Sequence, residues 1–268
     1  MARDTDAVFT GSIAELYERA LVPLIFSDYA EETARRVAAL SPENVLEVAA
    51  GTGVVTRALA RATDAAITAT DLNQPMLDHA ATVGTAREVT WRQADALALP
   101  FADASYDVVV CQFGVMFFPD RVRGWAEARR VLRPGGTLVV TVWDSLAANE
   151  LPDETQRTLG RLWPEDPPRF LERTPYGYHD PAVLRADAVA GGFGGAEVDA
   201  VSARARAATA REAAIAFVQG TTLRNEIEPR SATALAEATD AAAEAFAARF
   251  GASDLDTAIR AVYATASA

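Results

Sequence analysis

The chain has 268 residues, and half of them are hydrophobic, which is enough for one large domain with a sizeable core. Its 25 basic side chains are all arginine, so no lysine is present to form a Schiff base or to act as a general base. The formal net charge of -12 gives no basic field for a phosphate backbone, and we do not expect nucleic acid as a partner.

Cysteine and histidine are scarce. One cysteine, Cys111, excludes an internal disulfide, and two histidines, His79 and His179, make a histidine-based metal centre improbable, so we expect no metal. Residues 1–28 lack a positive start followed by a long apolar core, and no apolar run is long enough to span a bilayer. We therefore expect a cytoplasmic protein without a membrane partner.

The N-terminal region predicts two helices. Ser12 is a plausible N-cap for the first, with Glu15 placed three residues on for a capping box. Pro23 is expected to end that helix, because proline removes a backbone donor. A second helix is expected over residues 30–40.

The clearest pattern in the chain lies between Asn44 and Thr63. An apolar run, the small-residue turn Ala49–Gly53 and an amphipathic segment predict a buried strand, a tight turn and a helix. Glu47 interrupts the apolar run. A carboxylate in a buried strand is costly unless something pairs with it, and a ligand carrying an ammonium group would do so.

Downstream, apolar runs alternate with amphipathic segments. Such alternation predicts an α/β fold with a mostly parallel, seven-stranded sheet and helices on both faces. The Arg133–Gly136 run is expected to end the helix before it in a tight turn that leads into a strand, and not to form a phosphate-binding loop. The further strands are expected at 66–70, 89–93, 106–112, 137–143, 196–204 and 255–265, and the helices at 73–80, 121–132, 183–190, 211–219 and 231–250.

In parallel sheets of this kind ligands bind outside the carboxyl ends of the strands. That rule places five segments on one rim: Glu47–Gly53, Asp71, Asp95–Ala96, Gln112–Phe113 and Asp144.

Asp71 lies 20 residues beyond Gly51, where an acid can accept hydrogen bonds from the hydroxyls of a ribose. The alternative is that it caps the helix that follows. A nicotinamide-binding loop needs G-x-G-x-x-G, but Thr56 stands where the third glycine belongs, and Glu47 would oppose a pyrophosphate. The turn therefore suits a nucleoside with a positive group, which disfavours a nicotinamide-dependent oxidoreductase.

Several motifs in order, VLEVAAGTG, TATDLN, QADALALPF, YDVVVCQFGVMFF and RRVLRPGGTLVVTVWD, resemble those of class I S-adenosylmethionine-dependent methyltransferases. The closest subgroup is the small-molecule type related to the ubiquinone/menaquinone-biosynthesis C-methyltransferases. The similarity covers about residues 10–145. It implies a Rossmann-like, doubly wound fold with helical lid insertions, and S-adenosylmethionine as the cofactor.

The resemblance also implies roles for residues around the methionine part of the cofactor. Glu47 is placed near its amino group, and Gln112 and Phe113 face it. Ala49, Gly51 and Gly53 form the loop under the cofactor, although the family usually has glycine at the position of Ala49. Tyr17 resembles a tyrosine that covers the cofactor in relatives, and its alternative is a role in the core.

For the nucleoside part, the resemblance assigns the ribose hydroxyls to Asp71. Leu72 and Met76 are placed beside the adenine, although a methionine on a helix is more often a core residue. Asp95 receives the adenine amino group, and the backbone of Ala96 receives a ring nitrogen.

We expect one domain over residues 1–268, with a cofactor-binding core at 10–144 and lid or substrate-side insertions at 145–182 and 205–254. The apolar content of the insertions favours a closed pocket for a small-molecule substrate. The resemblance implies transfer of a methyl group from S-adenosylmethionine to a small organic acceptor by in-line displacement. The alternative is a methyltransferase-like enzyme that uses S-adenosylmethionine for non-methylating chemistry, such as rearrangement or decarboxylation.

A general base is needed only if the nucleophile of the acceptor carries a proton at neutral pH. His179 is the candidate catalytic residue, since imidazole titrates in the right range and the segment around it, with Tyr176 and Tyr178, could cap the site. The alternative for His179 is an ordinary polar position in a loop.

Overall fold

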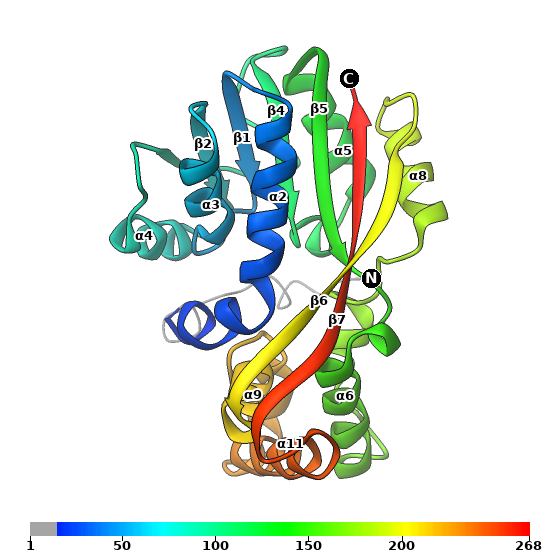
Figure 1. Cartoon of the computed structure of the whole chain (residues 1–268). Helices are drawn as coiled ribbons and strands as arrows, with labels where there is room; N and C mark the ends of the chain where they lie inside the picture. The colour runs from blue at the N-terminus through cyan, green and yellow to red at the C-terminus, as the bar shows by residue number, and fades with distance from the viewer. Residues whose placement is uncertain (1–14) are drawn as a thin grey trace.

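The computed structural model describes residues 15–268, which form a seven-stranded sheet with helices on both faces (Figure 1). The strand order is β3-β2-β1-β4-β5-β7-β6, with β1 to β5 parallel and β7 antiparallel to both of its neighbours. The predicted α/β class and mostly parallel sheet are confirmed, whereas the predicted Ser12 cap lies outside the described residues. The parallel strands are β1 (Asn44–Val48), β2 (Ala66–Asp71), β3 (Thr90–Gln93), β4 (Tyr106–Gln112) and β5 (Leu132–Trp143).

Both faces of the central strands are covered by helices. Successive side chains of a strand point to opposite faces, so a strand buried on both sides is a continuous apolar run. Val45 of β1 packs on the side of α2 and α3, whereas Val109 of β4 belongs to the cluster that includes α5 and α8. The covering helices are α2 (Ser27–Ala39), α3 (Val54–Ala62), α5 (Arg121–Val131) and α8 (Pro181–Ala190), and α4 (Gln74–Val83) follows β2.

The N-terminal helix differs from the prediction, because Pro23 does not end it. A π-helix, η2 (Tyr17–Phe26), contains Pro23 and continues directly into α2. Proline clashes with the carbonyl four residues back in an α-helix, but the wider π-turn is bonded five residues back. The Ser27 N–H accordingly donates to the Val22 carbonyl, so the helix bends past the proline without a break.

The start of β5 also differs, since the run after α5 is part of the strand rather than a stop before it. Tyr106 pairs with Leu132 but Val108 pairs with Thr137, so the register shifts at this point. Gly135 has a φ of 81°, which favours glycine, and its N–H donates to the carbonyl of Ala268 at 3.0 Å. The bulge therefore ties β5 to the last residue of the chain.

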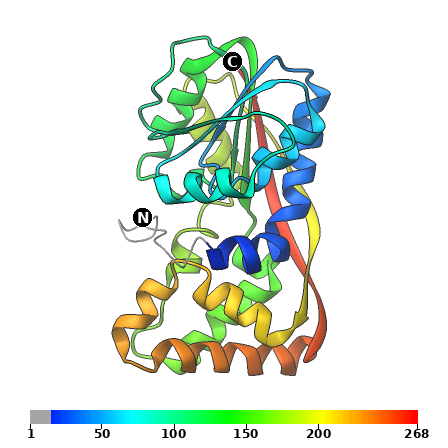
Figure 2. The same ribbon diagram turned by 90° about the vertical axis from the view of Figure 1, so that its left-hand side faces the viewer.

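The last two strands, β6 (Glu197–Thr209) and β7 (Ser253–Ser267), are longer than predicted. They pair antiparallel along almost their whole length and extend beyond the sheet, where they carry a helical layer (Figures 1 and 2). α6 packs against α9 and α11 in this layer. The helices and turns outside the sheet region are η3 (Val115–Phe117), η4 (Leu146–Ala148), α6 (Glu150–Leu162), α7 (Phe170–Arg173), α9 (Ala210–Gln219), α10 (Arg224–Ile227), η5 (Glu228–Arg230) and α11 (Ala234–Phe250).

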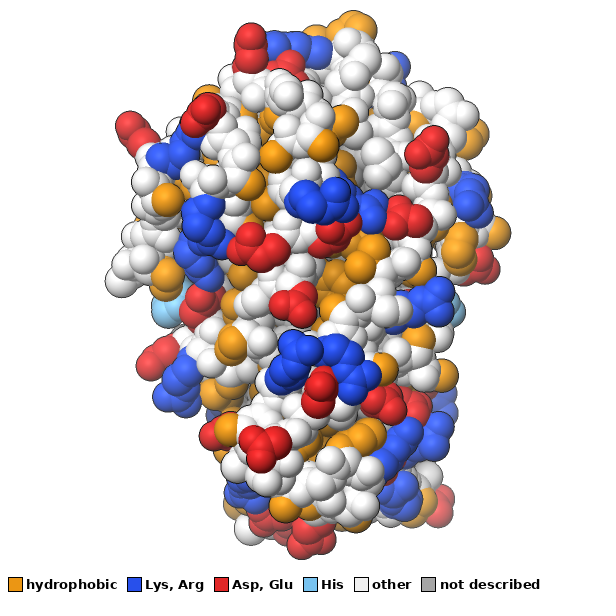
Figure 3. Space-filling view, viewed as in Figure 1, with side chains coloured by type: hydrophobic (Ala, Val, Ile, Leu, Met, Phe, Trp, Pro, Cys, Tyr) orange, Lys and Arg blue, Asp and Glu red, His pale blue; other side chains and the backbone are white. Residues whose placement is uncertain are grey.

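Opposite charges mix on the face shown in Figure 3, where arginine side chains lie beside acidic ones. Arg36, for example, donates both to Glu32 and to Asp199. None of the helices within residues 15–268 is long and apolar enough to cross a membrane.

Candidate functional site

A cavity of about 220 Å³ lies where the carboxyl ends of β1 to β5 meet η2, α7 and α9. Its lining includes eleven of the twelve residues predicted to bind the cofactor. These are Tyr17, Glu47, Ala49, Gly51, Asp71, Leu72, Met76, Asp95, Ala96, Gln112 and Phe113. The rule about strand ends therefore brings together residues from four separate strands, although their individual roles stay predictions.

Three predicted residues do not line the cavity. Gly53, with a φ of 83°, caps α3, and a Cβ on it would lie 2.8 Å from the ring of Trp91, so packing excludes a side chain there. Asp144 forms an ion pair with Arg260 at 3.1 Å. His179 places Nδ1 3.0 Å from the carbonyl of Tyr176 and is outside the lining, so the structure does not bring it to where a base would act.

The turn after β1 is held in an unusual backbone conformation. Ala49 and Gly51 have φ values of 56° and 55°, a region that costs energy for alanine. The turn packs against the end of β4, where a Cβ on Gly114 would lie 2.5 Å from that of Ala49. The Ala50 N–H donates to the Thr70 carbonyl at 2.9 Å, which fixes the turn to β2.

Glu47 is a buried carboxyl group at this turn, with 2% of its surface exposed. Its Oε2 accepts a hydrogen bond of 2.6 Å from the Thr56 hydroxyl at the start of α3. Burial raises the pKa of Glu47 to about 8, against the opposing effects of the Thr56 bond and the charge of Arg57. The group therefore binds a proton at neutral pH, and a cation placed in the cavity would favour its charged form.

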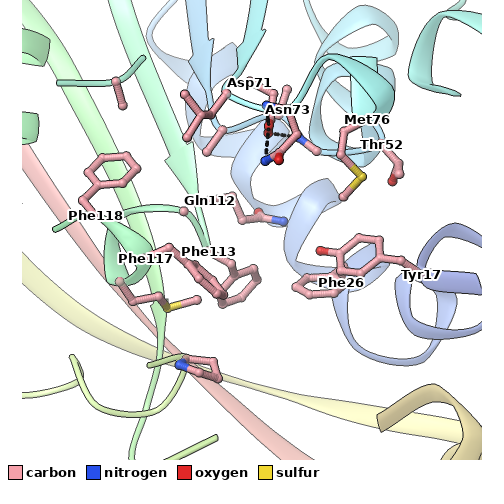
Figure 4. A pocket seen from close by; sticks show the side chains of 18 of the residues that line it. Tyr17, Phe26, Thr52, Asp71, Asn73, Met76, Gln112, Phe113, Phe117 and Phe118 are labelled. Atoms are coloured by element: carbon pink, nitrogen blue, oxygen red, sulfur yellow. Dashed lines mark hydrogen bonds between the residues drawn. The ribbon is translucent and has the colours of Figure 1, made fainter. Parts of the chain in front are cut away.

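Asp71 lies beside Glu47 at the end of β2 and connects the turn to the next helix. Its Oδ2 accepts from the Gly51 N–H at 2.9 Å, and its Oδ1 accepts from the backbone N–H of Asn73 at 2.8 Å and from the Asn73 amide at 3.3 Å (Figure 4). Burial raises the pKa of Asp71, and these bonds oppose that shift. Since a carboxylate offers about four lone-pair sites, it can still accept from a ligand.

An ion pair joins the π-helix to the glycine turn. Arg57 donates to Glu18 Oε1 at 2.5 Å and to the Thr52 carbonyl at 2.7 Å. Because Glu18 follows Tyr17, this contact, which we call the lid ion pair, fixes η2 next to the cavity. A second pair, Arg61 with Glu31, joins α3 to α2 and does not involve η2; the side chains of neither pair belong to the cavity lining.

Five aromatic side chains form a continuous row along the cavity, which we call the aromatic wall. Adjacent ring centroids are separated by 5.2 Å (Tyr17–Phe26), 5.3 Å (Phe26–Phe113), 3.9 Å (Phe113–Trp143) and 5.8 Å (Trp143–Tyr176). Phe113 and Trp143 stack with an angle of 12° between their planes. The backbone of Phe113 is strained, with a φ of 54° that is unusual for a bulky residue. Its ring packs within the aromatic wall.

The list of predicted residues missed several that line the cavity. Thr52 is buried, and its hydroxyl has no hydrogen-bond partner among the described residues. Asn73 lies two residues after the predicted strand-end residue Asp71, and Trp143 is the last residue of a predicted strand. The rule that ligands bind at strand ends could therefore have found both. Tyr176 and Phe217 belong to the insertions that were expected to close the pocket, and both line it, although neither was predicted as a cofactor-binding residue.

Comparison with known proteins supports the resemblance that the motifs suggest. Residues 46–140 match a protein-family model described as a methyltransferase domain. The demethylmenaquinone methyltransferase of Deinococcus radiodurans is 40% identical over 129 residues, which are 47% of this chain and 54% of that protein. The match thus spans about half the length of this curated relative.

Two solved structures show the same fold across almost the whole chain. A SAM-dependent methyltransferase from Thermotoga maritima is 17% identical, with a TM-score of 0.54 and coverage of 96% of each chain. A [4+2]-cyclase is 20% identical, with a TM-score of 0.57, and the match covers 96% of this chain and 94% of the cyclase. The Rossmann-like fold is confirmed, and residues 46–140 of this chain are similar to a methyltransferase domain.

Proposed function

We propose that this chain transfers a methyl group from S-adenosylmethionine to a small organic acceptor by in-line displacement. The observation that carries the proposal is the pair of buried carboxyl groups, Glu47 and Asp71, at one end of a cavity with an aromatic wall. Buried carboxylates are costly without partners. The cofactor would supply an ammonium group for the first and ribose hydroxyls for the second.

The residues present fit this cofactor. Thr56 is the hydrogen-bond partner of Glu47, and an ammonium ion would add the missing opposite charge. Asp71 retains acceptor sites beyond its bonds to Gly51 and Asn73. Leu72 is 55% exposed beside these groups and offers an apolar surface for a base.

When bound, the cofactor supplies a methyl group on a positively charged sulfur, and the task of the chain is to bind, align and exclude water. Glu47 and Asp71 would hold the two polar ends of the cofactor. Gln112 is fixed from behind, because its Oε1 accepts a 2.6 Å bond from the Thr33 hydroxyl, which leaves its amide N–H groups as donors. Neither histidine nor lysine belongs to the cavity lining in the described part of the chain, so we assign no base.

Calorimetric titration with S-adenosylmethionine and S-adenosylhomocysteine tests the cofactor site. We expect micromolar binding to the native chain and a loss of about tenfold or more in Asp71→Asn, since a hydrogen bond to a charged group contributes about 1.5–3 kcal/mol. Asp78→Asn is the matched control, because Asp78 is exposed on α4 and bonds to Gln74. Unchanged affinity in Asp71→Asn would refute the assignment.

The reaction is tested with S-adenosylmethionine that carries a deuterated methyl group. After incubation with small-molecule extracts, mass spectrometry should detect a product that has gained the labelled methyl. A product formed without the label, while the cofactor is not consumed, would instead support the non-methylating alternative.

A further inference from the structure

The cavity has two chemically different halves. Its charged lining residues, Glu47, Asp71 and Asp95, all lie in the half that we assign to the cofactor. The other half, which we call the acceptor half, is lined by side chains from η3, the loop after it, α7 and α9 (Figure 4 shows Phe117 and Phe118). Its apolar lining residues include Met116, Phe117, Phe118, Phe170, Leu171 and Phe217.

One polar side chain group in the acceptor half stands out, the hydroxyl of Tyr176. Tyr176 is 4% exposed and lines the cavity, and no partner for its hydroxyl is found among residues 15–268. Of the four other buried tyrosines, three use theirs: Tyr29 donates to Val201, Tyr178 to Asp187 and Tyr263 to Tyr29. A hydroxyl that lines the cavity without a partner in the protein is free to donate to a ligand, and such a bond makes a modest net contribution to binding.

The position of Tyr176 is fixed by its backbone and by its ring. Its N–H donates to the Leu171 carbonyl at 3.0 Å, and its carbonyl lies 3.0 Å from His179 Nδ1. The next residue is Gly177, where a Cβ would lie 2.5 Å from the Arg173 carbonyl oxygen, so the turn leaves no room for a side chain. The ring stacks on Trp143 at 29° between planes, which makes Tyr176 the end of the aromatic wall.

The Tyr176 hydroxyl is suited to act as a hydrogen-bond donor. Burial raises the pKa of the Tyr176 phenol well above its ordinary value of 10, so it stays protonated at neutral pH. The acceptor half provides no charged group among its described lining residues, so an ionised group of a ligand there would be buried without a counter-charge.

We propose that the acceptor half binds a flat, apolar acceptor molecule against the aromatic wall and that the Tyr176 hydroxyl orients it by donating one hydrogen bond to an oxygen of that molecule. This inference rests on the proposed function, because the cofactor must occupy the other half. Tyr176 is then the residue that distinguishes acceptors with an oxygen at this position from hydrocarbons of the same shape.

The test uses two probes of the same shape, 1-acetylnaphthalene and 1-isopropenylnaphthalene, in which a C=O replaces a C=CH₂. Binding of each to the chain saturated with S-adenosylhomocysteine is followed by quenching of tryptophan fluorescence, since Trp143 belongs to the wall. We expect the ketone to bind about fivefold more tightly, the value of one net hydrogen bond, and Tyr176→Phe to lose that preference.

Tyr178→Phe is the matched control, because it removes a neighbouring buried hydroxyl that bonds to Asp187 outside the cavity, and it should keep the preference. The proposal is overturned if Tyr176→Phe keeps the preference, or if neither probe binds to the saturated chain. Calorimetric titration of the same proteins with S-adenosylhomocysteine distinguishes a failure of the proposed function from a failure of this inference. Absent binding there contradicts the proposed function itself, whereas normal binding without a preference that depends on Tyr176 contradicts this inference alone.

Discussion

The most specific prediction concerns the proton on Glu47. With a pKa of about 8, the carboxyl group is roughly nine-tenths protonated at pH 7 in the free chain. An ammonium ion bound beside it favours the carboxylate, so binding of S-adenosylhomocysteine should release a proton. Below pH 7 the affinity should therefore rise with pH, by close to tenfold or about 1.4 kcal/mol for each pH unit.

Calorimetry between pH 6 and 7, in buffers with different ionisation enthalpies, measures both the affinity and the protons released. Glu47→Gln cannot release a proton, so its affinity should lose most of this slope. Glu43→Gln, just before β1 and away from the cavity, should behave as the native chain does. A native affinity that is independent of pH, with no protons released, would refute the reasoning.

Three further predictions test other parts of the structure. The folded chain binds the Glu47 proton more tightly than the unfolded chain does, so the contribution of this group to stability falls as pH rises from about 4.5 to about 8. In urea unfolding, the difference in unfolding free energy between Glu47→Gln and the native chain should therefore grow in favour of the variant, by up to about 2.7 kcal/mol from pH 5.5 to 7.5. In stopped-flow measurements, Glu18→Gln should speed release of S-adenosylhomocysteine about two- to fivefold by breaking the lid ion pair, whereas Glu31→Gln, which breaks the pair between α3 and α2, should leave the rate unchanged. Gly53→Ala should lower the unfolding free energy measured in urea by about 1–3 kcal/mol, since φ is positive there and the new Cβ would lie 2.8 Å from the Trp91 ring; an unchanged unfolding free energy would exclude the packing explanation.

The sequence predicted the central sheet well because its strands are buried on both faces. β4 was predicted with the same limits that the structure shows, from a continuous apolar run. The prediction at Pro23 was wrong, since it assumed an α-helix and the chain forms a π-helix there. β6 was predicted too short because most of its residues are at least partly exposed and its alanines give no clear alternation.

The site was predictable as far as the strand ends define it. Glu47, Asp71 and Gln112 each end or nearly end a strand, so parallel packing brings them to one rim. Tyr176 and Phe217 reach the same cavity from segments that follow the core in sequence, and only the long β6–β7 hairpin and its helices return α9 to the rim. Such contacts depend on tertiary packing, which no local pattern records.

A crystal structure of the chain with S-adenosylhomocysteine tests the central claim most directly. The account predicts the ligand in this cavity, with its ammonium group in contact with Glu47 and its ribose hydroxyls donating to Asp71. A ligand bound elsewhere, or bound in the cavity with both carboxyl groups making only the contacts to Thr56, Gly51 and Asn73 that they make now, would contradict it.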